Sequence, residues 1–130
     1  MIRGGDSGPM SYDLIFWKQG PGSGSDPASI YSNLMDGSVV HGLVTVPAEA
    51  MISDLTRAFP GSVRETNGSD EWLVWESDSR PATLEVSWTD HYLHASCRNL
   101  TDDELNRIID AAVGHGCPLY DPQTGERFAT

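Results

Sequence analysis

Residues 71–97 read EWLVWESDSRPATLEVSWTDHYLHASC, a pattern that predicts three consecutive β-strands. Aromatic and β-branched side chains dominate 71–77, 83–88 and 92–97, and such side chains favour extended backbone. The residues between these runs are rich in Asp, Ser, Pro and Thr, which favour turns. Strands that follow one another through short turns predict a mostly antiparallel sheet.

The middle strand indicates how this sheet is buried. Leu84, Val86 and Trp88 alternate with Glu85 and Ser87. Successive side chains of a strand point to opposite faces. One face of the sheet is therefore expected to be buried and the other to contact water.

The clearest helix start follows the third strand. Thr101 and Glu104 form a capping box, in which the Thr101 hydroxyl accepts from the backbone of Glu104 and the Glu104 side chain reaches back. Apolar residues at helical spacing continue from there to Val113.

Two further helices are predicted before the three strands. Pro47 opens one of them, and Phe-Pro-Gly at 59–61 closes it. Asp26 followed by Pro27 predicts an N-cap and the first helical position of a short helix, which Gly37 stops.

The two ends of the chain complete the predicted sheet. Residues 12–17 have apolar side chains on both faces of a short strand, and 119–120 and 127–128 flank a turn-forming stretch at 121–125. We expect an α+β fold with a single mostly antiparallel sheet of about four to five strands, helices packed on one face and a closing C-terminal hairpin.

Length and composition fit one domain. The chain has 130 residues, of which 38% are hydrophobic, enough for one core. We expect a disordered leader over 1–10, which is rich in glycine, and a single α+β domain over 11–130. No apolar run reaches the ~20 residues of a membrane helix, and no secretion signal is expected. Two cysteines, Cys97 and Cys117, suit a reduced cytoplasm.

The charge of the chain limits its partners. Nineteen acidic and eight basic residues give a formal net charge of −11, spread along the chain rather than collected in a tail. This charge argues against nucleic-acid binding, which needs cations to neutralise phosphates. It favours fast association with a basic partner.

Two segments carry a resemblance to a known family. Residues 12–18, YDLIFWK, and 116–128, GCPLYDPQTGERF, resemble the two ends of a family of small acidic bacterial proteins. Several members resemble immunity proteins, the antidotes that bacteria make against toxins of their own kin. The specific motifs lie only at these ends, and the resemblance implies no catalytic residue.

Two patterns could carry chemistry. His91 and His94 beside Asp90 suggest a metal site, but residues three apart on a strand point to opposite faces, and no third zinc ligand is visible. Cys97 or Cys117 could act as a nucleophile, although both occupy packing positions. A disulfide between them requires that their backbones lie close. We expect neither a metal nor a cofactor.

Aromatic and acidic residues form the stronger candidate site. Trp72 and Trp75 lie three apart on one strand and must point to opposite faces. If Trp75 lies under the helices, Trp72 is on the open face of the sheet. The partner-binding residues expected on that face are Asp13, Trp17, Trp72, Glu76, Glu85, Tyr92 and His94. The alternative is that the terminal hairpin or the Gly-rich connector at 20–25 covers the tryptophans.

These observations lead to an expected function. We expect an immunity-type binding protein of the cytoplasm, which neutralises a cognate toxin by stoichiometric occlusion of a basic active site or substrate cleft. One alternative is a small enzyme that uses a carboxylate, such as Glu76 or Glu85, or a histidine of the open face. Another is a structural module whose exposed tryptophans form a homodimer.

Overall fold

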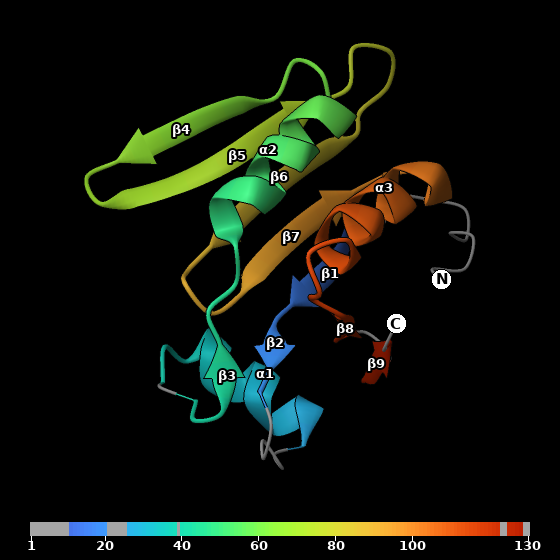
Figure 1. Cartoon of the computed structure of the whole chain (residues 1–130). Helices are drawn as coiled ribbons and strands as arrows, with labels where there is room; N and C mark the ends of the chain where they lie inside the picture. The colour runs from blue at the N-terminus through green and yellow to red at the C-terminus, as the bar shows by residue number, and fades with distance from the viewer. Residues whose placement is uncertain (1–10, 21–25, 39, 123–124, 129–130) are drawn as a thin grey trace.

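The strands predicted from the sequence lie within a wider antiparallel sheet. The computed structural model describes residues 11–20, 26–38, 40–122 and 125–128. Its main sheet has seven strands in the order β4-β5-β6-β7-β1-β8-β9 (Figure 1). In chain order these are β1 (Ser11–Phe16), β4 (Val63–Asn67), β5 (Asp70–Glu76), β6 (Thr83–Trp88), β7 (Leu93–Arg98), β8 (Leu119–Asp121) and β9 (Glu126–Phe128).

Three helices and a two-stranded ribbon complete the described part of the chain. They are β2 (Lys18–Gln19), α1 (Pro27–Met35), β3 (Leu43–Val44), α2 (Ala48–Ala58) and α3 (Asp102–Val113). The predicted α+β class and the closing hairpin, β8 with β9, are confirmed. The sheet is wider than the expected four to five strands. The expected leader at 1–10, most of the connector and the centre of the last turn lie outside the described residues.

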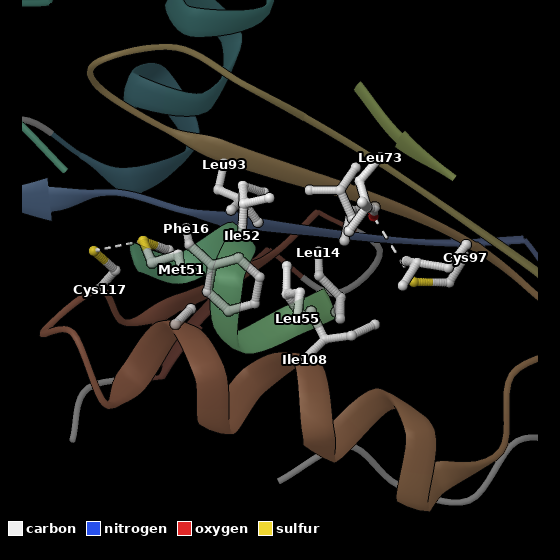
Figure 2. Packing of buried hydrophobic residues seen from close by; sticks show 14 of the residues in the cluster. Leu14, Phe16, Met51, Ile52, Leu55, Leu73, Leu93, Cys97, Ile108 and Cys117 are labelled. Atoms are coloured by element: carbon white, nitrogen blue, oxygen red, sulfur yellow. Dashed lines mark hydrogen bonds between the residues drawn. The ribbon is translucent and has the colours of Figure 1, made fainter. Parts of the chain in front are cut away.

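The main core lies between one face of the sheet and the pair α2 and α3. Both helices lie in front of the sheet in Figure 1 and pack against each other. Leu14 and Phe16 of β1 meet Met51 and Leu55 of α2 and Ile108 of α3, and each of these side chains is at most 1% exposed (Figure 2). The alternation predicted for β6 is confirmed, because Leu84 and Val86 belong to the same core.

Helix α1 packs on the opposite face, which differs from the expected placement of all helices on one face. Ile15 lies between Leu14 and Phe16 on β1, so its side chain points away from the main core. It is fully buried in a second cluster with Ile30 and Leu34 of α1. These two α1 residues are four apart and therefore share one side of the helix.

Both predicted side-chain caps are confirmed. The Asp26 carboxylate accepts from the backbone N–H of Ser29 at 3.2 Å at the start of α1. At the start of α3, Thr101 Oγ1 accepts from the N–H of Glu104 at 3.1 Å, and Glu104 Oε1 accepts from the N–H of Thr101 at 2.9 Å. Arg80 also pairs with Glu104, which joins α3 to the β5–β6 connection. None of the described helices has the length and apolar character needed to cross a bilayer.

Candidate protein-binding site on the sheet

The face of the sheet opposite α2 and α3 is covered at one end. There α1 packs over Ile15 of β1 and Tyr120 of β8. Trp72 and Val74 of β5, farther along the same face, belong to neither buried cluster of the described residues. We call this part of the face, which lies outside the cover of α1, the acidic sheet face. On β4, β5 and β6 it comprises Val63, Glu65, Asn67, Asp70, Trp72, Val74, Glu76, Thr83, Glu85 and Ser87, and the exposed Arg98 of β7 lies beside Thr83 on the same face.

The strand register sets apolar side chains of the acidic sheet face beside acids. The first row across β4, β5 and β6 is Glu65, Trp72 and Ser87. The second row is Val63, Val74 and Glu85. Directly opposite residues have Cβ atoms about 4.5–5.5 Å apart, so Trp72 adjoins Glu65 and Val74 adjoins Glu85. Val63 is 55% exposed, and both Trp72 and Val74 are half-buried.

The acids of this face differ from the nearby acids on the helix side. On the helix side, Arg64 lies between Glu49 and Glu71, with N–O distances of 2.6 and 2.7 Å. The hydrogen bond from Arg64, helped by its positive charge, outweighs desolvation and lowers the pKa of Glu49. Across the described ranges, no cationic side chain pairs with an acid of the acidic sheet face: Glu65, Asp70, Glu76 or Glu85. Their charge is therefore available to a partner.

The two tryptophans of β5 point to opposite faces, as predicted. Trp75 packs edge-on against Phe59 with ring centroids 5.1 Å apart, and its indole N–H donates to the carbonyl of Pro60 at 3.3 Å. Trp72 lies on the acidic sheet face. Trp75 is thus part of the packing under α2, whereas Trp72 belongs to neither buried cluster of the described residues.

Asp13 and His94 lie where the covered and uncovered parts of this face meet. Nε2 of His94 is 3.1 Å from Oδ1 of Asp13, which links β7 to β1. His94 lies opposite Ser87 in the register, next to the row that contains Trp72. The structure therefore places five predicted site residues on one face of the sheet: Asp13, Trp72, Glu76, Glu85 and His94.

The prediction that Trp17 contacts a partner is wrong. Trp17 is 0% exposed and belongs to the cluster formed with Ile30 and Leu34 of α1. Its indole N–H donates to Oε1 of Gln19 at 3.2 Å. The reason is that α1 covers this end of the sheet, so that Trp17 packs inside the protein.

Tyr92 also lies away from the acidic sheet face. It precedes β7 instead of starting it, and it packs half-buried against the α1 cluster. There it lines a pocket of about 280 Å³ with Leu34, Gly37, Ser38, Val40, Leu43, Thr89 and His91. This volume is at the lower end of small-molecule sites, and the pocket is separate from the surface around Trp72.

Both cysteines are buried thiols, and the disulfide left open by the sequence is not formed. Burial raises the pKa of the Cys97 thiol well above its usual range, and the charge of Asp13 adds to the shift. Cys117 packs with its Sγ 4.0 Å from Sδ of Met51 (Figure 2). A buried thiol is a poor nucleophile. Within the described ranges, no three His, Cys, Asp or Glu side chains are grouped to hold a metal ion.

Strand β4, which supplies Val63 and Glu65, was not expected from the sequence. All five of its residues are exposed, so it lacks the alternation that marks a half-buried strand. One signal was available. Gly68 and Ser69 form a two-residue connection to β5, and Gly68 has a φ of 65°. Glycine at the first position of such a connection favours a hairpin.

Comparison with known proteins finds no family model, no curated protein and no solved structure that matches this chain. Its class therefore rests on its own fold and site. It is an acidic α+β protein, and on the part of its sheet face that no described helix covers, Trp72 and Val74 lie beside carboxylates that pair with no described cation.

Proposed function

We propose that this protein is an immunity-type binding protein, which acts in the cytoplasm and neutralises a cognate toxin in a one-to-one complex. In this proposal the acidic sheet face occupies the active site or substrate cleft of the toxin. The inhibitor acts by occupancy and turns over no substrate.

The observation that carries the proposal is the setting of Trp72. Its indole is half-exposed between Glu65 and Ser87, with Val63 and Val74 in the adjacent row. Tryptophan is enriched among the residues that dominate interface energies, and such residues lie within a less energetic polar rim. The centre of the proposed contact surface is apolar and consists of Val63, Trp72 and Val74. These side chains have no acid–base group, which favours binding over catalysis.

Charge supports a basic partner. The acids of this face have no described cationic partner, and the whole chain has a net charge of −11. An enzyme that acts on nucleic acid or a nucleotide needs a basic cleft, which such a face complements. Joining two copies through the same face would bring like charges together, which disfavours the homodimer alternative.

The direct test is to co-express the protein with the product of the neighbouring gene and to separate the mixture by size-exclusion chromatography with light scattering. We expect a one-to-one complex, which Trp72→Ala disrupts. Met35→Ala is the matched control, because Met35 is an apolar residue of α1 that is 37% exposed at the covered end of the sheet, outside the acidic sheet face. Failure of the two folded wild-type proteins to associate would reject the proposal.

A further inference from the structure

We infer that the partner adds an extended basic segment to the free edge of β4 as an eighth strand of the main sheet. The inference rests on the proposed function and specifies how the partner is held. It adds backbone hydrogen bonds at an edge to the side-chain contacts of the acidic sheet face.

The position of β4 in the fold supports this mode of binding. β4 is the terminal strand of the seven-stranded sheet, and among the described elements it pairs with β5 alone. In Figure 1 the β4–β5 hairpin forms the outer edge of the sheet. All five side chains of β4 are exposed. An uncovered edge strand presents backbone donors and acceptors that can pair with another chain.

The side chains of β4 do little to block this edge. Protected edges often use proline or outward lysine, and β4, with the sequence VRETN, has neither. Its one cation, Arg64, is held by Glu49 and Glu71 and lies 5.2 Å from the ring centroid of Trp88. Arg64 is thus engaged on the helix side of the sheet. The charge that remains for an incoming strand is that of Glu65, which pairs with no cation in the described part of the chain.

The register predicts the chemistry of the incoming segment. Val63 and Glu65 lie two apart and share the open face, so the added strand meets them with two alternate side chains. A basic side chain fits beside Glu65 and an apolar one beside Val63, because cross-strand pairs of opposite charge or of apolar residues stabilise a sheet. Next to Arg64, which already has two carboxylates, a small polar side chain fits.

A second copy of this chain is a poorer occupant of the edge. Two copies of β4 could pair antiparallel and join the two sheets into one, with the helix-covered faces on the same side. Because directly opposite residues share a face, one residue of β4 then lies opposite the same residue of the other copy. At the centre of the strand that residue is Glu65. Like charges directly opposite each other destabilise a sheet, and each chain carries a net charge of −11.

A short synthetic peptide tests the inference, with lysine and valine alternating on one face and threonine on the other. Backbone amide exchange of the protein is followed by NMR with and without this peptide. We expect slower exchange in β4 and no effect from a matched peptide in which glutamate replaces lysine. Glu65→Lys should weaken the affinity about tenfold, because an attractive cross-strand pair becomes repulsive. Asp110→Lys is the control, since it makes the same charge reversal at an exposed residue of α3, on the helix side of the sheet.

The outcomes separate this inference from the proposed function. Unchanged β4 exchange in the presence of the lysine peptide overturns strand addition, as does equal weakening by both lysine variants. A concentration-dependent dimer that protects β4 without peptide also overturns it in favour of self-association. If Glu65→Lys is unfolded by circular dichroism, Glu65→Gln replaces it, with a smaller expected loss. If the toxin complex forms but leaves β4 exchange unchanged, only strand addition fails; absence of the complex rejects the proposed function itself.

Discussion

The rings of Trp17 and Tyr120 pack against each other, with centroids 5.3 Å apart and planes inclined by 38°. Trp17 follows β1, and Tyr120 lies on β8 opposite Ile15 in the register. Tyr31 of α1 lies 5.3 Å from the same Tyr120 ring. Burial raises the pKa of Tyr120, which fits its position inside this cluster. The aromatic contacts thus fix α1 to the end of the sheet that it covers.

Trp17→Ala should destabilise the fold. Removing a buried aromatic side chain costs about 3–5 kcal/mol of the free energy of unfolding, because it leaves a cavity in the cluster under α1. Urea denaturation of the wild type and the variant measures the loss. An unchanged midpoint would mean that α1 does not depend on this cluster.

Trp72→Ala should mainly reduce partner affinity, whereas Trp75→Ala should mainly reduce stability. Trp72→Ala should leave most of the stability intact and reduce partner affinity by about 2–4 kcal/mol, as expected for an interface anchor. Trp75→Ala should lower the melting temperature, because it removes the contact with Phe59 and the hydrogen bond to Pro60. Calorimetric melting and titration with the partner measure both quantities. A collapsed melt for Trp72→Ala would assign that indole to the core and contradict the proposed site.

Local signals predicted a large part of this fold. The alternation around Leu84 and Val86 predicts the buried face of β6, and the capping box at Thr101 predicts the start of α3. The three-residue spacing of Trp72 and Trp75 was enough to place them on opposite faces. Each of these features depends on neighbours in the sequence, so it can be read without the tertiary structure.

The missed features depend on contacts between distant segments. Trp17 is buried because Tyr120 and α1 converge on it, and no local pattern reports that convergence. A strand such as β4 carries no burial pattern, because every side chain is exposed. The helix α1 has a normal apolar stripe at Ile30 and Leu34, but the stripe does not show which face of the sheet it covers. The structure therefore has the predicted residues of β5 and β6 on one face of the sheet, whereas Trp17 lies in the interior under α1.

The Cys97 thiol should be unreactive in the folded protein. Its side chain is 2% exposed, and burial holds the thiol in its neutral form by raising the pKa. We expect very slow labelling by a thiol reagent at neutral pH, with full labelling after unfolding in urea. Mass spectrometry of the labelled peptides distinguishes Cys97 from Cys117. Rapid labelling of Cys97 in the native protein would contradict its burial.

The raised pKa of Cys97 also makes the free energy of unfolding decrease with pH in the alkaline range. A thiol of the unfolded chain ionises near pH 8.5, whereas Cys97 in the folded protein stays protonated above that pH. As pH rises, the thiol therefore loses its proton in the unfolded state first. The contribution of Cys97 to the free energy of unfolding is complete below about pH 8.5 and is lost as pH rises further. The expected slope is about 1.4 kcal/mol per pH unit from this group. Cys97→Ala should lack that part of the slope between about pH 8.5 and 10, before tyrosines ionise in the unfolded chain.

Association with the partner should be fast at low salt and slower at high salt. The carboxylates of the acidic sheet face act over a Debye length of about 8–10 Å near physiological ionic strength, and added salt shortens this range. Because charge mainly guides the encounter, the association rate should fall with salt while the dissociation rate changes less.

Glu85→Lys should lower the association rate, since it reverses a charge beside Val74. Asp110→Lys on α3 makes the same charge change away from this face and should have a smaller effect. Stopped-flow measurements at low and high salt compare the three proteins. Equal slowing by both variants would show that net charge alone guides the encounter, and a flat dependence on salt would show that these acids do not steer the partner.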